Sequence, residues 1–187
     1  KKIIMEIKQI TTPLSDRVVE ELRAGEKVFL SGYIYTARDA AHKRFVDALE
    51  KGDILPIDIE GQVIYYCGPS PAPPGRVIGA CGPTTSSRMD AYSPRLISLG
   101  LKGMIGKGKR SQAVRDAIKE HKSVYFGATG GAGALLSKSV VSSEVIAYEE
   151  LGPEAVVKLG VRNMPLFVVN DVYGNDLYEE GMQRYRK

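Results

Sequence analysis

Short apolar runs alternate with amphipathic segments along most of this chain, and this alternation restricts the fold more than any other feature of the sequence. The run KVFLSGYIYT (27–36) predicts a mostly buried strand. The next segment, RDAAHKRFVDALEKG (38–52), predicts a helix, because its apolar residues from Ala41 to Leu49 recur at the spacing of one helical face. Repetition of this order predicts an α/β layered domain with an extra β element at the ends.

The remaining elements are expected from the same patterns. Ser15 and Ser111 are expected to cap the helices that they precede, and residues 173–175 to form a turn. Further strands are predicted within 3–13, 62–68, 75–82, 103–106 and 123–127, helices within 14–26, 93–100 and 111–121, a glycine turn with a small-residue helix within 127–140, and two or three strands within 155–180.

Length and composition fit one globular domain that covers 1–187. The chain has 187 residues, of which 43% are hydrophobic and 26% charged. It has no apolar run near the ~18 residues that span a bilayer, and the start KKIIMEIKQ lacks the apolar core of a signal peptide. We therefore expect a cytoplasmic protein with no membrane partner.

The charge balance favours small anions over nucleic acid as partners. The formal net charge is +4 and the pI is near 9.0, so a weak attraction to anions is expected. The densest basic cluster, KGKR (107–110), is short and has no interleaved aromatic residues, so no nucleic-acid partner is expected.

The two cysteines, Cys67 and Cys81, each end an apolar run, VIYYC and VIGAC. Two buried thiols are the expected state. Zinc sites and iron–sulfur clusters usually take three or four ligands, so the two cysteines cannot hold either alone. We predict no metal ligands in this chain, and the ligands of any cluster would come mostly from elsewhere.

Polar residues follow three of the predicted strands where the next helix begins. They are ARDAAH (37–42), TTSSR (84–88) and KGKRS (107–111). In open α/β sheets, ligands lie at the carboxyl ends of strands, beside helix N-termini whose free N–H groups favour anions. Arginine binds a carboxylate through two parallel hydrogen bonds. The three junctions therefore predict a site for a small, multiply negative ligand.

Each junction also has an ordinary structural explanation. Arg38 and Asp39 would form a surface ion pair, the hydroxyls of Thr84 and Thr85 would satisfy free N–H groups at a helix start, and the cations of 109–110 would be solvated. Two further observations favour a ligand. Glycines flank the junctions and let a ligand approach the backbone closely, and a histidine lies one helical turn after Arg38: Gly82, Gly106, Gly108 and His42.

The glycine-rich segment GATGGAGALL (127–136) does not predict a dinucleotide site. It lacks the G-x-G-x-x-G spacing, and no acidic residue follows at the usual distance. Close packing, or a backbone wall for a small ligand, is the better interpretation.

With these residues assembled, nearly the whole chain resembles one family. GPTTSSRMD (82–90), preceded by ARDAAHKR (37–44) and followed by KGKRS (107–111), is similar to the β subunit of class I (iron–sulfur) fumarate hydratase and to its close relative, the β subunit of L(+)-tartrate dehydratase. GGAGALL (130–136) and EELGPEAVVKLGVRNMPLFVVND (149–171) extend the resemblance. Three motifs in this order are specific, whereas one alone would be weak.

The resemblance implies a swivelling β/β/α domain, equivalent to the C-terminal half of the single-chain enzymes. It implies a partner α subunit in a hetero-oligomer, with a [4Fe–4S] cluster held by three cysteines of that α subunit and not by this chain. By motif position Thr84 matches the proposed base, and Arg38, Arg88 and Lys107 match substrate-binding residues. Serines at 86–87 replace the usual glycine or alanine, and a lysine at 109 replaces a more usual asparagine, which leaves the matched residues in place.

The implied chemistry agrees with the residue types. Fumarate and malate are C4 dicarboxylate dianions, and removal of a proton beside a carboxylate adds negative charge that fixed cations stabilise. The implied function is reversible hydration of fumarate to (S)-malate by a hydro-lyase, in which the open iron of the cluster acts as a Lewis acid. L(+)-tartrate dehydratase and a non-catalytic anion-binding assembly module stay open as alternatives.

Overall fold

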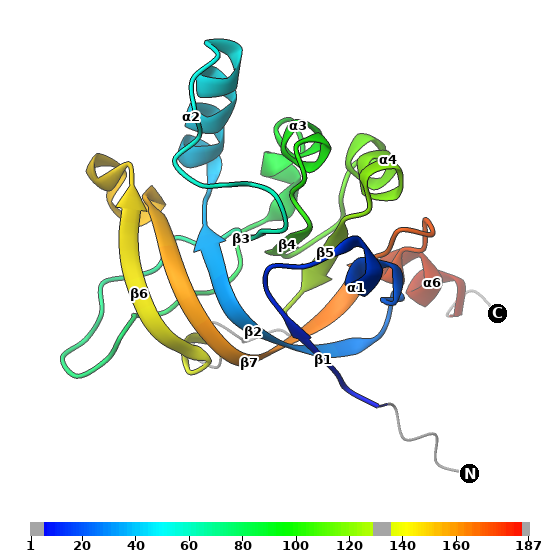
Figure 1. Ribbon diagram of the computed structural model, residues 1–187. Coiled ribbons are helices and arrows are strands. Elements are labelled where there is room, and N and C mark those ends of the chain that lie inside the picture. The colour runs from blue at the N-terminus through cyan, green and yellow to red at the C-terminus, as the bar shows by residue number, and fades with distance from the viewer. Residues whose placement is uncertain (1–5, 129–135, 185–187) are drawn as a thin grey trace.

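The structure is a computed structural model that describes residues 6–128 and 136–184 (Figure 1). The start of the predicted strand at 3–13 and most of the glycine segment 127–136 lie outside the described residues. The strands are β1 (Lys8–Thr11), β2 (Lys27–Thr36), β3 (Val63–Tyr65), β4 (Gly103–Gly106), β5 (Val124–Gly127), β6 (Val140–Ala147) and β7 (Val156–Asn170). The helices are α1 (Asp16–Glu20), α2 (Asp39–Glu50), η1 (Ser86–Met89), α3 (Ser93–Ser98), α4 (Gln112–His121), η2 (Glu149–Glu154) and α6 (Leu177–Arg184).

The strands form one sheet that curls until two of its strands meet. β2, β3, β4 and β5 are parallel neighbours, and β7 runs antiparallel to both β5 and β2. These pairings close a ring of five strands, while β1 pairs with β2 and β6 pairs with β7 beside the ring. The mixed α/β class predicted from the sequence is confirmed, and the closed, barrel-like sheet is its specific form.

Two hydrophobic clusters occupy the two faces of the parallel strands. Val63 and Tyr65 of β3 belong to a cluster that draws side chains from every strand of the ring, so it fills the ring interior. Ile64 and Tyr66, which point the opposite way, join a second cluster with Phe45 and other residues of the helices. Helices α2, α3 and α4 accordingly lie together over the outer face of β3 and β4 (Figure 1). Burial on both faces explains why β3, β4 and β5 contain no charged residue and are buried along their whole length.

Most predicted elements are present, and the two predicted caps are confirmed. The Ser15 hydroxyl accepts the Val18 N–H, and the Ser111 hydroxyl accepts the Val114 N–H, each at 3.3 Å. The turn at 173–175 is also confirmed.

Two predictions were wrong, and one strand was missed. Residues 75–82 form an irregular segment rather than a strand. The last segment forms one fifteen-residue strand, β7, followed by helix α6, rather than two or three strands. Strand β6 was not predicted, because five of its eight residues are exposed and its sequence, VVSSEVIA, has a polar centre.

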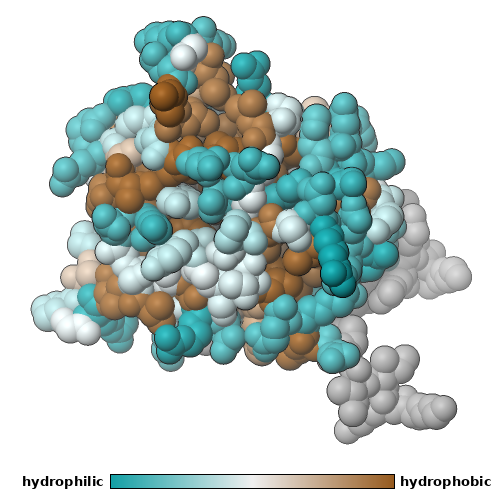
Figure 2. Space-filling view, in the orientation of Figure 1, coloured by the Kyte–Doolittle hydropathy of each residue, from teal (hydrophilic) through white to brown (hydrophobic). Residues whose placement is uncertain are grey.

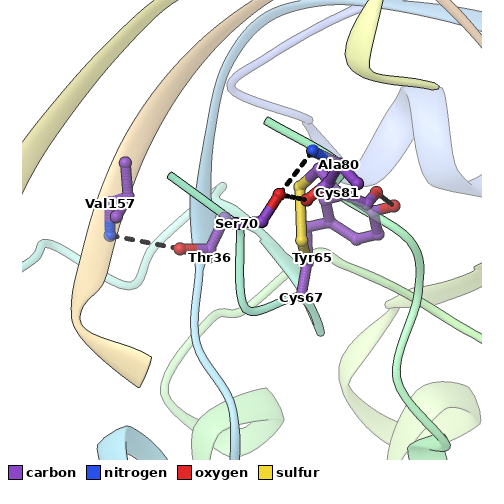
Figure 3. The surroundings of a disulfide bond; sticks show 7 residues. All are labelled: Thr36, Tyr65, Cys67, Ser70, Ala80, Cys81 and Val157. Atoms are coloured by element: carbon purple, nitrogen blue, oxygen red, sulfur yellow. Dashed lines mark hydrogen bonds between the residues drawn. A yellow bond between two sulfur atoms is a disulfide. The ribbon is translucent and has the colours of Figure 1, made fainter. Parts of the chain in front are cut away.

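The cysteines are buried as expected, but they are not thiols. Cys67 and Cys81 are each 1% exposed and are joined by a disulfide with 5.9 Å between their Cα atoms (Figure 3). The disulfide closes the proline-rich loop that follows β3, and the Tyr65 hydroxyl donates to the Cys81 carbonyl. Within the loop, the Ala80 N–H donates to the Ser70 hydroxyl at 2.7 Å. The loop is therefore fastened at its base.

None of the helices in the described part of the chain is long and apolar enough to cross a membrane.

Candidate functional site

The three polar junctions meet at one edge of the sheet. Backbone bonds join them: Ala37 N–H donates to the Tyr65 carbonyl at 3.1 Å, and Thr84 N–H to the Tyr66 carbonyl at 2.7 Å. Ser86 N–H donates to the Lys107 carbonyl at 2.9 Å. The segment that contains Thr84 therefore lies between the ends of β3 and β4, although about twenty residues separate it from each in sequence. The prediction that the three polar junctions come together at the carboxyl ends of the strands is therefore confirmed.

Arg38 is the N-cap of α2 and the second residue after β2. Its side chain is 29% exposed, and its Nε lies 3.9 Å from Glu154 Oε1 of η2. A methyl group placed on Gly68 would lie 2.9 Å from Arg38 Nη1, so the guanidinium passes directly over the Gly68 backbone. Arg38 Nε is buried and has no hydrogen-bond partner among the described residues, which leaves donor capacity at the site.

Arg88 links the second junction to the first. Its Nε lies 3.2 Å from Asp39 Oδ1 at the start of α2, and both side chains are partly exposed. The predicted pair between Arg38 and Asp39 is therefore wrong, since Asp39 pairs with Arg88. An exposed ion pair of this kind contributes little to stability, so a carboxylate ligand could replace Asp39 as the partner of Arg88 at small cost.

Thr84 is partly buried and Lys107 is exposed at the end of β4. The N-cap of η1 is Thr85, and its hydroxyl makes no capping hydrogen bond, so the expected capping by Thr85 is wrong. Within residues 6–128 and 136–184, neither the Thr84 hydroxyl nor the Lys107 ammonium has a hydrogen-bond or ion-pair partner. Both groups are therefore available to a ligand.

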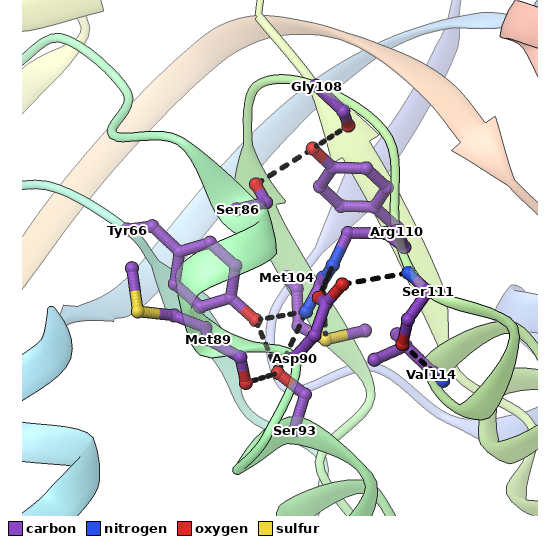
Figure 4. A network of polar contacts seen from close by, with 11 residues as sticks. Tyr66, Ser86, Met89, Asp90, Ser93, Met104, Gly108, Arg110, Ser111 and Val114 are labelled. Carbon is purple, nitrogen blue, oxygen red and sulfur yellow. Dashed lines mark hydrogen bonds and ion pairs between the residues drawn. The ribbon is translucent and has the colours of Figure 1, made fainter.

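Arg110, which was expected to be solvated, is 5% exposed and lies within a network of polar contacts that includes Tyr66, Asp90 and Ser93 (Figure 4). Its Nε lies 2.7 Å from Asp90 Oδ1, and its Nη2 donates to the Tyr66 hydroxyl at 3.1 Å and to Ser93 Oγ at 2.8 Å. Burial acts to lower the pKa of Arg110, but Tyr66 and Asp90 more than offset it, so the pKa lies above its ordinary value. Sequence reasoning missed this residue because a basic cluster does not reveal which member turns inward.

Gly106 is required for packing and not for ligand approach. A methyl group on Gly106 would collide with Ser86 Oγ and lie 2.8 Å from Tyr66 Cδ2. The Ser86 hydroxyl fills that space and is 2.8 Å from the Tyr125 hydroxyl, which donates to the Gly108 carbonyl at 2.8 Å. The prediction that a ligand uses this room is therefore wrong for Gly106. Gly108 differs, since it has φ +87° and open space around it.

His42 does not face the site as a solvated group. It is fully buried, with its ring against Phe45, Tyr66 and Tyr92. Burial lowers its pKa to about 4. Nδ1 lies 2.8 Å from the Arg38 carbonyl, which only accepts, so the neutral ring carries its proton on Nδ1.

Two cavities formed by described residues lie away from the four predicted site residues. A cavity of about 340 Å³ lies between the proline-rich loop and β6, one of about 540 Å³ lies beside β1, and neither is lined by Arg38, Thr84, Arg88 or Lys107. The space-filling view shows hydrophobic and hydrophilic residues interspersed, with hydrophobic residues reaching the surface near α2 (Figure 2). Ile54, in the segment after α2, is 95% exposed.

The residues present do not fit a metal ion or an iron–sulfur cluster held by this chain. Both cysteines are used in the disulfide. Within the described residues, no group of three or more His, Cys, Asp or Glu side chains could hold a metal ion. The polar groups at the edge include cations and hydroxyls, which suit a small anionic ligand, besides the carboxylates of Asp39 and Glu154 that lie near Arg88 and Arg38.

Comparison with known proteins supports one family. The family model described as "Fumarase C-terminus" matches residues 2–181. "Fumarate hydratase class I, aerobic" of Salmonella typhimurium is 37% identical over 175 residues, and "Fumarate hydratase 2" of Leishmania major is 39% identical over 170 residues. "Putative L(+)-tartrate dehydratase subunit beta" of Methanocaldococcus jannaschii is 38% identical over 173 residues.

The share of each relative that is matched differs. The three matches cover 91%, 88% and 89% of this chain. They cover only 30% of each of the two fumarate hydratases but 89% of the protein from Methanocaldococcus jannaschii. The chain thus spans less than a third of the length of the fumarate hydratases and nearly the whole length of a protein named as a subunit.

Proposed function

The chain belongs to the fumarase C-terminal family, and from this premise we propose that it is the β subunit of an iron–sulfur hydro-lyase that hydrates fumarate reversibly to (S)-malate. The observation that carries the proposal is the convergence of Arg38, the Thr84–Arg88 segment and Lys107 at one edge of the sheet. We also propose that the domain has the swivelling β/β/α architecture of the family and acts in the cytoplasm.

In the proposed reaction, Arg38, Arg88 and Lys107 bind the carboxylates of a C4 dicarboxylate. Thr84 removes or returns the proton on the carbon beside one carboxylate, where negative charge develops. The cations that bind that carboxylate stabilise the charge at the stage where it is largest. A threonine hydroxyl is a weak base, and the positive charge of Arg88, four residues onward in the same segment, would stabilise its deprotonated form.

A partner α subunit is part of the proposal. The lack of cluster ligands among the described residues agrees with a site that is completed by a second subunit. The [4Fe–4S] cluster would be ligated by the α subunit, where it would supply a Lewis acid to the reaction. The part proposed for this chain is to bind the substrate and move the proton.

L(+)-tartrate dehydration is the second candidate function. The observation that favours it is the 89% of the length of "Putative L(+)-tartrate dehydratase subunit beta" that the chain matches. L(+)-Tartrate is also a C4 dicarboxylate, so the same cations would bind it. The number and spacing of the cations do not separate the two substrates.

The test uses the chain assembled with its α subunit, assayed in parallel with fumarate, (S)-malate and L(+)-tartrate. Turnover of fumarate and malate supports the first candidate, and turnover of tartrate alone supports the second. An assembled complex with its cluster intact that turns over none of them would leave the chain as a non-catalytic assembly module.

The arginine variant Arg88→Lys tests the site itself. A lysine retains the charge but loses the paired hydrogen-bonding geometry, so kcat/KM is expected to fall by about 10²-fold. Arg44→Lys is the matched control, because Arg44 is also about half exposed and pairs with one carboxylate, Glu150, at 2.9 Å. Equal activity of the two variants would remove Arg88 from the site.

A further inference from the structure

A buried guanidinium contacts several segments that build the candidate site. Arg110 belongs to the loop between β4 and α4. Its partners come from elsewhere: Tyr66 follows β3, Asp90 ends η1, Ser93 begins α3, and Met104 lies in β4. One side chain therefore connects four parts of the fold (Figure 4).

The guanidinium is held in one orientation. Nε pairs with Asp90 at 2.7 Å, Nη1 donates to Met104 Sδ at 3.4 Å, and Nη2 donates to two hydroxyls. The arginine side chain of this ion pair is fully buried and that of Asp90 is 15% exposed. A buried charge is strongly unfavourable unless it is paired and hydrogen-bonded, so displacement of Arg110 from these partners is unfavourable.

Two short paths lead from Arg110 to the site, and the first passes through Tyr66 and Asp90. The Tyr66 hydroxyl accepts from Arg110, and its carbonyl accepts the Thr84 N–H at 2.7 Å. Asp90 lies two residues after Arg88, and its Oδ2 accepts the Ser111 N–H at 2.7 Å. The ends of the Thr84–Arg88 segment are thereby fixed on either side.

The second path passes through Tyr125. Arg110 lies over the Tyr125 ring, with 4.8 Å from its guanidinium carbon to the ring centroid. The Tyr125 hydroxyl is bonded to Ser86 Oγ and to the Gly108 carbonyl, both at 2.8 Å. Ser86 N–H in turn donates to the Lys107 carbonyl. The spacing between the Thr84–Arg88 segment and Lys107 thus depends on groups that Arg110 contacts.

We propose that Arg110 is a positioning residue that holds Thr84, Arg88 and Lys107 in the geometry of the bound anion. It touches no substrate and acts through Tyr66, Asp90 and Tyr125. The claim that this geometry serves to bind an anion rests on the proposed function. Whether Arg110 fixes the geometry can be measured without any assay of activity.

The first measurement is amide hydrogen exchange at Thr84 and Ser86 in the unmodified chain and in Arg110→Lys. Lysine retains the charge but loses the fork that contacts several partners at once. The two amides are expected to exchange at least about tenfold faster in the variant, relative to the amides of β4 and β5.

Arg115→Lys is the matched control. Arg115 lies in α4 and forms a two-pronged ion pair with Glu179 at 2.7 and 3.2 Å, so its loss tests removal of an arginine fork away from the site. It is expected to leave the Thr84 and Ser86 amides at the rates of the unmodified chain. The proposal would be overturned if the Thr84 and Ser86 amides were unprotected in the unmodified chain. It would also be overturned if all core amides exchanged faster by the same factor in Arg110→Lys.

The second measurement separates positioning from stability. The double variant Arg110→Met with Asp90→Asn removes the buried charges together, a change that is often neutral for stability, and leaves an oxygen to accept the Ser111 N–H. In the assembled enzyme, it is expected to keep its melting temperature within a few degrees, while kcat falls by about 10²-fold, the scale of a misplacement of about 1 Å.

A double variant with unchanged kcat would overturn the proposal. The proposal would also be overturned if the double variant lost activity only because it unfolds, and if the Thr84 and Ser86 amides stayed protected in Arg110→Lys. An unmodified complex that hydrates no C4 dicarboxylate would instead refute the proposed function. In that case the exchange measurements still decide whether Arg110 fixes the loop geometry.

Discussion

Acidification is expected to destabilise this protein through one buried histidine. His42 carries its proton on Nδ1, which donates to the Arg38 carbonyl at 2.8 Å. Its Nε2 is buried without a hydrogen-bond partner among the described residues, and Arg110 lies near enough to disfavour a second positive charge. Burial is the larger cause, and together they lower the pKa of His42 from 6.5 to about 4.

The sign and size of the effect follow from proton uptake. As the pH falls below 6.5, the unfolded chain binds a proton at His42 and the folded chain does not, so the free energy of unfolding decreases down to about pH 4. From about pH 7 to about pH 5, this one group is expected to remove about 2 kcal/mol. That is a large part of the stability of an ordinary domain.

The assay is urea unfolding of the chain at the two pH values, in the unmodified form and in His42→Leu. Leucine fills a similar apolar space and does not titrate, so the variant is expected to lose about 2 kcal/mol less between the two pH values. His121→Gln is the control, because His121 is the other histidine of the chain and its side chain is 35% exposed. The reasoning is refuted if His42→Leu loses as much stability on acidification as the unmodified chain.

Two further substitutions test the site and its packing. Thr84→Val is expected to fold, assemble and bind substrate, yet to lower kcat by about 10²–10⁴-fold, as for loss of a general base. If kcat stays within a few-fold while the melting temperature of the complex drops, Thr84 serves stability alone. Gly106→Ala is expected to destabilise the chain by about 1–3 kcal/mol in denaturant unfolding, since the new methyl collides with Ser86. Gly181→Ala in α6 meets nothing within 4 Å and should stabilise instead, so a shift of the same sign in both would contradict the packing argument.

The parts of the fold that the sequence predicted are those with local signals. The strand at 27–36 and the helix after it have clear periodicity, and Ser15 and Ser111 are side-chain caps next to apolar runs. The segment 75–82 has the apolar content of a strand, and Ile78 and Cys81 are indeed buried, but their burial comes from packing and a disulfide and not from strand pairing. A short apolar run cannot distinguish these causes.

At the site, the sequence predicted which junctions converge but not which side chains turn inward. The carboxyl ends of parallel strands lie at the same edge of the sheet, so Arg38, the Thr84 segment and Lys107 come together there whatever the packing of the helices that connect the strands. The inward turn of Arg110 depends on Asp90, which is twenty residues away in sequence, and on two tyrosines, Tyr66 after β3 and Tyr125 in β5. The sequence signal for this inward turn would have been an acidic residue in a different motif, the final Asp of GPTTSSRMD.

Closure of the sheet also sets the order in which this protein can become functional during synthesis. β2 leads into Arg38, but one side of β2 pairs with β7, which is made after every other strand. The interior residues Tyr65 and Phe126 consequently have no complete enclosure until β7 joins. Contacts so distant in sequence form slowly and leave apolar surface exposed in the meantime. The edge that carries the candidate site is therefore expected to be assembled in a single late step, after β7 has left the ribosome.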